Sequence, residues 1–428
     1  MDKGNETEKI GWSFFPLETV IDKISTNGKK IKQKEYIVEG KYPVIDQGAD
    51  FIGGYTNDDS KVLRCDLPVV VFGDHTKILK LVRFHFVPGA DGVKVLLPHK
   101  SILPELFVFF VKILLRKIPD KGYARHFQHL EKSEIPIPPL PEQRAIVAKL
   151  EQLFSELDNG IACLKKAQEQ LKVYRQAVLK QAFEGELTKA WRRENCVDYQ
   201  KWSKQNIARL GNIVTGNTPS KQNSEYYDSK EYPFYKPTDL DAGLCIVNSF
   251  DGLSLSGYIV GRKAPINSIL VTCIGATIGK TGLVKREGCF NQQINAIIPF
   301  DGYDAKYVYY QAISVDFQMQ LKAHAVATTL PILNKGKFSN LEMSVCSHDE
   351  QSQIVQEIET RLSVCDNMEA TIKESLEKAE ALRQSILKKA FEGKLLSEEE
   401  LQITRKAPDW EPADKLLERI RSEKRTAK

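Results

Sequence analysis

The sequence lacks the features that mark a secreted or membrane-spanning chain. Its first twelve residues, MDKGNETEKIGW, contain no apolar stretch of the kind that forms a signal peptide. The most apolar run, residues 106–115, is short and carries Lys112, so we expect a core helix there. The eight cysteines are scattered and form no C-x-x-C pair, which argues against a zinc site or a disulfide framework. Reduced thiols and a cytoplasmic location are therefore expected.

The motifs of common catalytic centres are also missing. Residues 275–281 (GATIGKT) resemble a P-loop, but three residues separate the glycines where that motif has four. The backbone of such a loop can still meet a DNA phosphate. His126 and His129 could share a helix face, but no third metal ligand accompanies them. No N/D-P-P-Y/F tetrapeptide, loop for S-adenosylmethionine or Ser–His–acid arrangement is evident, so we expect no catalytic residue, metal or cofactor in this chain.

Length and charge describe a multidomain protein with mildly basic parts. The chain of 428 residues is long enough for more than one domain, and 27% charged with 42% hydrophobic residues is an ordinary soluble composition. Its net charge of +5 includes +4 over residues 12–141 and +2 over 205–345, against 0 over 142–187 and −2 over 350–395. A polyanion would therefore contact residues 12–141 and 205–345, which are basic, and not residues 142–187 and 350–395.

One stretch of the sequence occurs twice. Residues 350–395 repeat residues 142–187 at a constant offset of 208, without a gap, and 20 of the 46 positions are identical. Both copies end in the pattern Lys-x-Ala-Phe-Glu-Gly-x-Leu, at 180–187 and 388–395. A repeat of this length indicates an internal duplication.

Each copy is predicted to form one long helix with an apolar seam. Apolar residues recur at every seventh position, which is the spacing of a coiled coil. The seam residues are Leu150, Leu157, Leu164, Leu171 and Val178 in the first copy and Ile358, Cys365, Ile372, Ala379 and Ile386 in the second. About 40 helical residues, at about 1.5 Å each, make a rod of roughly 60 Å. Because each seam needs an apolar partner, we expect the helices to pair; two independent surface helices are the alternative.

The ends of the two helices carry suitable signals. Pro141 fits a first helical turn, and Ser347 with Glu350 has the spacing of a capping box. Gly185 and Gly393 stand where a helix end favours a residue with positive φ.

The segments before the two helices are predicted to be related α+β domains. Strand-like runs at 36–38, 67–72, 79–87 and 93–97 precede a helix at 104–117 in the first segment. The second segment repeats this plan loosely, since 67–82 resembles 267–284 and 89–98 resembles 291–299. The division that we expect is an N-terminal extension (1–11), a first domain (12–141), a spacer helix (142–187), a basic connector (188–204), a second domain (205–346), a second spacer helix (347–395) and a charged tail (396–428). The tail, with zero net charge, carries Trp410 and a short amphipathic stretch at 416–420; we expect it near the N-terminus or on a partner.

Eight loops combine small residues with side chains that can bond base edges or phosphates. They are residues 46–55, 73–77 and 122–127 in the first domain and 216–221, 235–239, 275–280, 291–293 and 327–329 in the second. Each loop alone is also compatible with ordinary turn chemistry. The candidate DNA-binding residues are Gln47, Gly73, Asp74, His75, Thr76, Lys77, Tyr123, Arg125, His126, Asn217, Thr218, Ser220, Lys221, Lys236, Thr238, Asp239, Thr277, Lys280, Asn291, Gln292, Gln293, Thr328 and Thr329.

This succession of domain, helix, related domain and matching helix resembles the specificity subunit of type I restriction–modification systems. The resemblance covers almost the whole chain. Its motifs are IPIPPLPEQRAIVAKLE at 135–151, the paired helix ends, PVVVFGDHT at 68–76, GYARH at 122–126, GxTP at 216–219 and YPFYKPTDL at 232–240. The second helix departs from the pattern at its start, where SHDEQ replaces PPLPEQ.

The resemblance implies two target-recognition domains that each read one half of a split, asymmetric site in double-stranded DNA. The spacer helices would form an antiparallel coiled coil with pseudo-two-fold symmetry. The subunit would have no activity alone. Two modification subunits, resembling N6-adenine methyltransferases that use S-adenosylmethionine, would dock on the helices, and restriction subunits using ATP and Mg would join them in a bacterial or archaeal cytoplasm, at the nucleoid.

Two other functions are compatible with parts of the sequence. An enzyme that combines recognition with catalysis would need a methylase or nuclease motif, and neither is found. A purely structural coiled-coil adaptor would bind no DNA with any methylase partner. An orphan DNA-binding subunit that has lost its partners is a further possibility within the family.

Overall fold

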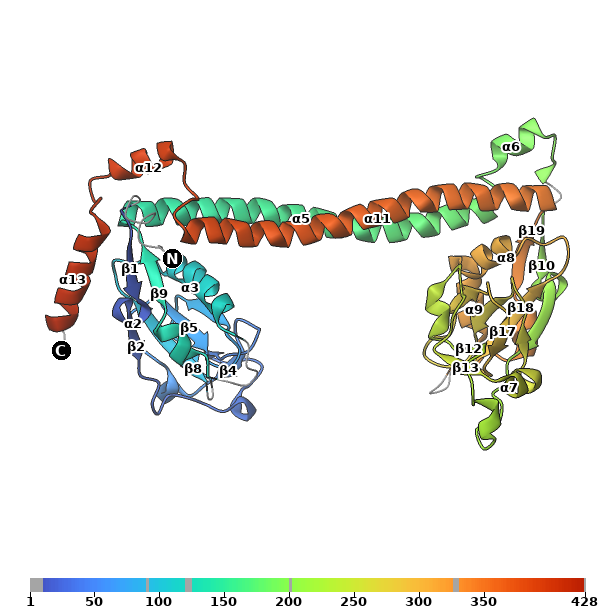
Figure 1. Cartoon of the computed structure of the whole chain (residues 1–428), viewed down its shortest axis with the longest axis horizontal. Helices are drawn as coiled ribbons and strands as arrows, with labels where there is room; N and C mark the ends of the chain where they lie inside the picture. The colour runs from blue at the N-terminus through green and yellow to red at the C-terminus, as the bar shows by residue number, and fades with distance from the viewer. Residues whose placement is uncertain (1–10, 90–91, 120–124, 200–201, 326–330, 427–428) are drawn as a thin grey trace. The chain divides into compact units, whose positions relative to one another are not determined.

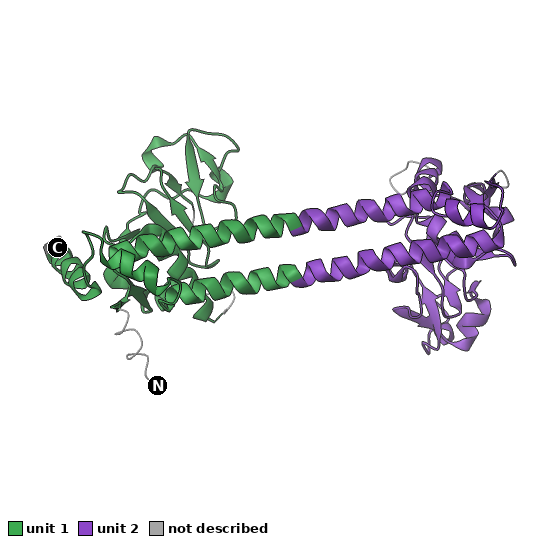
Figure 2. Ribbon diagram, turned by 90° about the horizontal axis from the view of Figure 1, so that it is seen from above, with its two compact units in different colours: residues 1–163, 375–428 green, residues 164–374 purple. Residues whose placement is uncertain are grey.

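The computed structural model describes residues 11–89, 92–119, 125–199, 202–325 and 331–426. The chain divides into two compact units, drawn in green and purple in Figure 2: residues 1–163 with 375–428 (unit 1) and residues 164–374 (unit 2). Each unit contains one globular domain, the first part of one long helix and the last part of the other. This division follows from the two helices α5 (Leu140–Phe183) and α11 (His348–Phe391), of 44 residues each.

The globular domain of unit 1 is built on three small sheets. A four-stranded antiparallel sheet has the order β2-β8-β5-β6, a three-stranded sheet the order β4-β3-β7, and β1 pairs with β9. The strands are β1 (Ser13–Pro16), β2 (Ile21–Ile24), β3 (Tyr42–Ile45), β4 (Gly54–Thr56), β5 (Val69–Gly73), β6 (Leu79–Val82), β7 (Val87–Pro88), β8 (Val93–Pro98) and β9 (Glu134–Ile137). The helices are α2 (Leu17–Val20), α3 (Pro104–Lys117) and α4 (Phe127–Glu131).

The domain of unit 2 repeats this topology. Its four-stranded sheet β11-β18-β15-β16 corresponds to β2-β8-β5-β6, its sheet β13-β12-β17-β14 corresponds to β4-β3-β7, and β10 pairs with β19 as β1 pairs with β9. The strands are β10 (Ser203–Asn206), β11 (Gly211–Thr215), β12 (Tyr232–Tyr235), β13 (Asp251–Leu253), β14 (Lys263–Ala264), β15 (Ile269–Thr272), β16 (Thr281–Leu283), β17 (Gly288–Phe290), β18 (Ile294–Pro299) and β19 (Glu342–Val345). The helices are α6 (Lys189–Glu194), α7 (Leu255–Val260), α8 (Ala305–Ala312), α9 (Val315–His324) and α10 (Lys335–Ser339). The shared strand order therefore confirms the prediction that the two domains are related.

The long helices run antiparallel within each unit, as Figures 1 and 2 show. In unit 1 the start of α5, with Ile146 and Leu150, shares one apolar core with the end of α11, with Ile386 and Ala390. In unit 2 the end of α5 and the start of α11 share the corresponding core. The same cores include the globular domains, so each domain is built onto a pair of helix ends. The expected α+β fold with an antiparallel coiled coil is confirmed.

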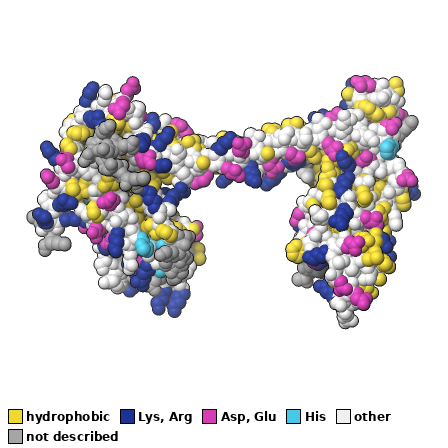
Figure 3. Space-filling view, in the orientation of Figure 1, with side chains coloured by type: hydrophobic (Ala, Val, Ile, Leu, Met, Phe, Trp, Pro, Cys, Tyr) yellow, Lys and Arg dark blue, Asp and Glu magenta, His cyan; other side chains and the backbone are white. Residues whose placement is uncertain are grey.

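Eight of the ten predicted seam residues are buried, and Leu157 and Leu164 are partly buried. The predicted glycine ends also adopt positive φ, +78° at Gly185 and +69° at Gly393. Basic and acidic side chains are interspersed along the visible face of the two helices in Figure 3. These observations agree with a helix pair that is apolar along its seam and polar outside it.

Three local expectations need correction. Residues 36–38 form no strand: Ile37 makes an isolated bridge to Tyr55, and Val38 is 90% exposed. The run at 79–87 is divided into β6 and β7, which belong to different sheets. At the start of α11 the capping box is only half made. The Glu350 backbone N–H donates to Ser347 Oγ at 3.4 Å, but the Glu350 carboxylate is bonded elsewhere.

The charged tail is an integral part of unit 1. It forms α12 (Glu398–Arg405) and α13 (Ala413–Thr426), and Leu416 and Ile420 of α13 are fully buried in the unit 1 core. Lys424 Nζ donates to the carbonyl oxygen of Ile21 at 2.5 Å and pairs with Asp22 at 3.0 Å. The tail therefore lies on the N-terminal part of its own chain, the first of the two placements expected.

Candidate nucleic-acid interface

Three loops of unit 1 converge where the strands β3, β5 and β8 end or begin. Gln47 follows β3, and its carbonyl oxygen accepts a 2.8 Å hydrogen bond from Thr76 Oγ1 in the β5–β6 turn. The side-chain oxygen of Gln47 accepts a bond of 3.3 Å from the His75 backbone N–H. The Asp74 backbone N–H donates to the Gly92 carbonyl, just before β8, at 2.7 Å. Loops 46–55 and 73–77 thus meet at one surface.

Gly92 stands in this surface where its backbone lies close to the side chains of Gln47 and His75. Gly92 has φ +87°, and a Cβ there would lie 2.8 Å from Gln47 Oε1 and from the His75 ring. A side chain at this position would both strain the backbone and displace the two polar side chains. The glycine therefore lets three loops approach one another.

Asp74 and His126 support this surface from beneath. Asp74 is 4% exposed; its Oδ1 accepts from the Phe127 backbone N–H at 2.8 Å, and its carbonyl accepts from the His126 N–H at 3.0 Å. His126 is 1% exposed, and its Nε2 has no hydrogen-bond partner among the described residues. Arg125 beside it is exposed. In this structure Arg125 is presented to solvent, while Asp74 and His126 are not.

Four loops of unit 2 converge in the corresponding place. The Asn217 backbone N–H donates to the Phe290 carbonyl at 3.1 Å, and Thr218 bonds the side chain of Gln292. The Asn291 N–H donates to the carbonyl of Tyr235, the last residue of β12, at 3.1 Å. The Gln293 carbonyl accepts from the N–H of Cys273, which precedes loop 275–280, at 2.7 Å. Loops 216–221, 235–239, 275–280 and 291–293 therefore form a second surface.

Acidic partners fix two of the three lysines of this second surface. Lys280 pairs with Asp241 at 2.7 Å, and Lys236 pairs with Asp251. Lys236 and Lys280 are partly exposed, so these pairs can open toward a phosphate at modest cost. Asp241, in a short 3-10 helix, and Asp251, the first residue of β13, are far from their lysines in the sequence, and only the fold brings each pair together.

The candidate residues differ in exposure. The exposed ones are Thr76, Arg125, Thr218, Ser220, Lys221, Thr238, Thr277 and Gln292. The partly exposed ones are Gln47, His75, Lys77, Asn217, Lys236, Asp239, Lys280 and Gln293. The buried ones are Gly73, Asp74, His126 and Asn291. Tyr123, Thr328 and Thr329 lie outside the described residues.

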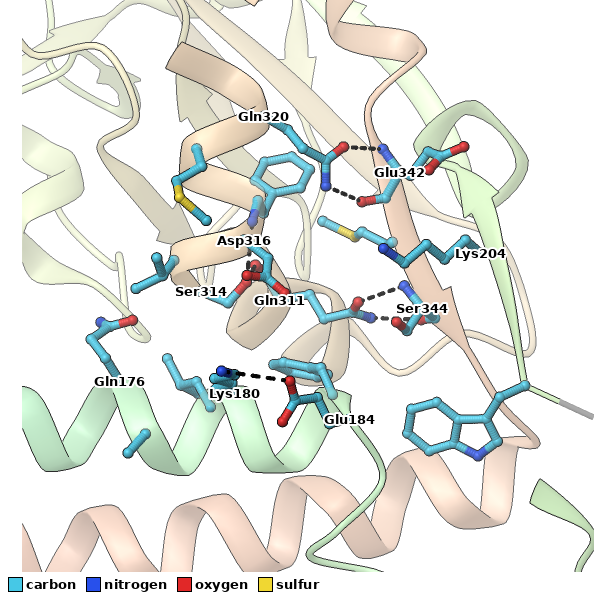
Figure 4. A pocket seen from close by; sticks show the side chains of 18 of the residues that line it. Gln176, Lys180, Glu184, Lys204, Gln311, Ser314, Asp316, Gln320, Glu342 and Ser344 are labelled. Carbon is cyan, nitrogen blue, oxygen red and sulfur yellow. Dashed lines mark hydrogen bonds and ion pairs between the residues drawn. The ribbon is translucent and has the colours of Figure 1, made fainter. Parts of the chain in front are cut away.

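One cavity of unit 2 lies away from the candidate contact residues. A cavity of about 940 Å³ lies between the end of α5, α9 and β19 (Figure 4). There the amide of Gln320 exchanges hydrogen bonds with the backbone of Glu342, and that of Gln311 with the backbone of Ser344. These bonds join helices to a strand, which indicates a structural junction. None of the candidate contact residues lines this cavity.

Buried thiols are held in their neutral form. Burial raises the pKa of the Cys273 thiol to about 12 and that of Cys289 to about 11. Neither is a ready nucleophile, because the thiolate is the reactive species. Among the described residues, no group of three His, Cys, Asp or Glu side chains could hold a metal ion, and no helix is long and apolar enough to cross a membrane.

The family model for the type I restriction modification DNA specificity domain matches the chain twice, over residues 9–166 and 199–378. The chain belongs to this family. Each match contains one globular domain and most of the long helix that follows it, so the duplication seen in the sequence is a duplication of the family's domain. The chain is a type I specificity subunit with two target-recognition domains.

Two curated relatives match this chain over most of their length, and a third matches over a shorter part. The specificity subunit of EcoR124I/EcoR124II from Escherichia coli is 24% identical over 83% of this chain and 86% of its own. That of StySPI from Salmonella potsdam is 24% identical over 99% and 97%. That of HindI from Haemophilus influenzae is 33% identical over 38% and 36%.

Solved structures share the fold. A chain from a study of complex assembly and conformational transition of the type I R-M system superposes with a TM-score of 0.69 at 19% identity, covering 90% of this chain and 98% of that one. The HsdS subunit from Thermoanaerobacter tengcongensis gives a TM-score of 0.55 at 20% identity, with 90% and 97% covered.

Proposed function

We propose that this subunit reads a bipartite, asymmetric site in double-stranded DNA, with one half-site for each target-recognition domain, and that it directs modification and restriction subunits to that site. The observation that carries the proposal is the pair of loop surfaces at corresponding ends of corresponding sheets. One surface contains Gln47, His75 and Thr76, and the other contains Asn217, Lys280 and Gln292. Two frameworks that agree in topology but carry different polar side chains suit two different half-sites.

The long helices suit the role of a spacer. Half-sites one helical turn apart have centres roughly 34–36 Å from each other, and a helix of 44 residues extends for about 66 Å. We infer that the pair of helices sets the distance between the half-sites and offers the surface on which modification subunits dock.

Catalysis belongs to the partners in this proposal. A methyltransferase that acts on adenine flips the base into its own active-site pocket. The modification subunit would supply this pocket, and the specificity subunit would recognise the sequence. S-adenosylmethionine, ATP and Mg would be bound by the modification and restriction subunits. The modest net charge of +5 is consistent with partners that share the phosphate contacts.

Co-expression with a cognate modification subunit, followed by mapping of methylated adenines across the host genome, tests the proposal. We expect methylation within one motif made of two specific half-sites separated by a fixed number of unspecified bases. Methylation at a single contiguous motif would contradict the reading of one half-site by each domain. Complex formation without DNA binding or methylation would favour the coiled-coil adaptor.

A further inference from the structure

Each spacer helix begins with a buried Glu-Gln pair, Glu142-Gln143 in α5 and Glu350-Gln351 in α11. The exposed fraction of these side chains is 0% for Glu142, Gln143 and Glu350 and 1% for Gln351. They are also the first two identical positions of the 46-residue repeat. Buried carboxylates are costly unless they are well bonded, so their partners define what they hold together.

Glu350 joins three parts of unit 2. The indole Nε1 of Trp202, the residue before β10, donates to its Oε2 at 2.9 Å. Thr188 Oγ1 and Arg192 Nη1, which follow the end of α5, donate to its Oε1 at 2.8 and 2.5 Å. The carboxylate at the start of α11 therefore ties the recognition domain to its own helix and to the end of the neighbouring helix.

Glu142 joins the corresponding parts of unit 1. The Nε1 of Trp12, the residue before β1, donates to Glu142 Oε2 at 2.7 Å. The Nε1 of Trp410, in the segment that follows α11, donates to Oε1 at 3.3 Å. Trp12 and Trp202 hold equivalent places, whereas Trp410 takes the place of Thr188 and Arg192. The same three-way junction is thus made twice with partly different residues.

The glutamines fasten the helix starts to the domains at a second point. Gln143 accepts from the Leu103 backbone N–H at 2.8 Å and donates to the carbonyl oxygens of Ser101 and Pro138 at 3.0 and 2.9 Å. Gln351 accepts from the Asp304 N–H at 2.9 Å and donates to the Cys346 carbonyl at 3.1 Å. Each domain is therefore bonded to its helix on two sides.

These hydrogen bonds differ in kind from the apolar contacts around them. Apolar burial holds a domain on a helix without a preferred direction, whereas hydrogen bonds weaken steeply when their angle changes. We propose that Glu142 and Glu350 are positioning residues that fix the angle of each recognition domain on its helices, and thereby the number of base pairs allowed between the two half-sites. This inference rests on the proposed reading of a bipartite site.

A small change in angle has a measurable consequence on DNA. Successive base pairs are about 3.4 Å apart along the helix axis. We use 'gap' for the number of base pairs between the two half-sites. A domain whose angle on its helices is less tightly fixed, so that its contact loops shift by roughly that distance, would accept a gap one base pair shorter or longer. A glutamate that served only folding would instead alter stability and leave the preferred gap unchanged.

The test uses Trp202→Phe, which removes one indole N–H and keeps an aromatic ring in the core, together with Glu350→Gln. Trp191→Phe is a matched control, because Trp191 lies in the same unit and donates none of the bonds to Glu350. Full-length variants in complex with the modification subunit are bound to duplexes that carry the mapped half-sites at the native gap and at gaps one and two base pairs shorter and longer. Thermal unfolding of each variant is recorded in parallel.

We expect the wild type and Trp191→Phe to bind altered gaps about tenfold or more weakly than the native gap, a loss typical of a mismatched site. Trp202→Phe and Glu350→Gln should reduce this difference to about threefold at gaps altered by one base pair, with unchanged base preference in each half-site. If Trp202→Phe and Glu350→Gln depended on the gap as the wild type does, or bound every gap more weakly by the same factor, the inference would be overturned and the proposed function would stand. A wild type without any gap preference would overturn the proposed function as well.

Discussion

Arg175 of α5 forms an ion pair with Asp366 of α11 at 2.7 Å in unit 2. The same pair recurs in unit 1 with the helices exchanged, since Arg383 of α11 pairs with Asp158 of α5. Each residue lies 208 positions from its counterpart, so both pairs are products of the duplication and both obey one antiparallel register. Charged pairs beside an apolar seam are a common means of selecting register and partner.

Reversal of one charge should weaken the helix pair. Arg175→Glu places a carboxylate against Asp366 and Glu369, with which Arg175 pairs at 2.7 and 2.9 Å. We expect a loss of about 1 kcal/mol in the free energy of unfolding, because the aspartate is 65% exposed and solvent screens the pair. Urea unfolding followed by circular dichroism measures it.

The double variant Arg175→Glu with Asp366→Arg is the control for this prediction. It restores one attractive pair, so we expect recovery of most of the lost free energy. A double variant as unstable as the sum of its single variants would show that the two side chains do not interact.

Removal of the buried charge of Glu350 should cost more than removal of that of Glu142. Glu350→Gln leaves Arg192, 8% exposed, without its carboxylate, and breaking a buried pair in this way costs about 3–5 kcal/mol. Glu142 accepts from the neutral indoles of Trp12 and Trp410, so Glu142→Gln should cost about 1–3 kcal/mol. Denaturant unfolding of both variants gives the comparison, and equal losses would contradict the role assigned to Arg192.

The docking of α13 should depend on pH through His99. Burial lowers the pKa of His99 from its ordinary value of 6.5, although Glu423, at 3.2 Å, opposes the shift. A histidine whose pKa is lowered in the folded state contributes stability above pH 6.5, and this contribution falls as the pH drops below that value. The protection factors of the α13 amide protons, which are corrected for the slower intrinsic exchange at low pH, should therefore fall between pH 7 and pH 5. His99→Gln should flatten this dependence, whereas an identical profile in the variant would assign it to other groups.

Single basic residues should affect one half-site each. Lys280→Ala should weaken binding to the half-site of unit 2 and lower the slope of log affinity against log salt by about 1, as expected for one phosphate contact. Arg125→Ala should do the same for the half-site of unit 1. Affinities for duplexes with one half-site scrambled separate the two effects.

Lys285→Ala is the matched control, since Lys285 lies at the opposite end of β16 from Lys280 and donates to Asn267 at 3.3 Å. It should leave both half-sites and the salt slope unchanged. Unaltered affinity of Lys280→Ala or Arg125→Ala at both half-sites would remove these residues from the contact set.

The helices and the overall plan were accessible from the sequence because they depend on periodic patterns. A gapless repeat with an apolar residue at every seventh position predicts paired helices whatever surrounds them. The strand assignment was less complete. Residues 79–87 look like one continuous strand, but Val82 pairs with Val69 of one sheet and Val87 pairs with Val44 of another. That division depends on contacts with distant strands, which a local pattern does not contain.

The candidate site was predictable only in part for the same reason. Loop composition selected Lys236 and Lys280, but their partners Asp251 and Asp241 lie outside those loops and distant in the sequence. Composition also selected His126, which the fold buries next to Asp74. The junction glutamates Glu142 and Glu350 carried a usable signal, as identical polar residues at the start of both repeats, but a helix start alone accounts for an acidic residue there.

The most direct test of the account lengthens both spacer helices by seven residues. Cys163 lies five residues after Asp158, and Lys378 lies five residues before Arg383, its ion-pair partner. One heptad is therefore inserted directly after Cys163 and one directly before Lys378. Seven helical residues add about 10.5 Å, or roughly three base pairs of DNA. Methylated adenines are then mapped with the modification subunit present. The account predicts the same two half-sites with a gap about three base pairs longer; an unchanged gap would contradict it.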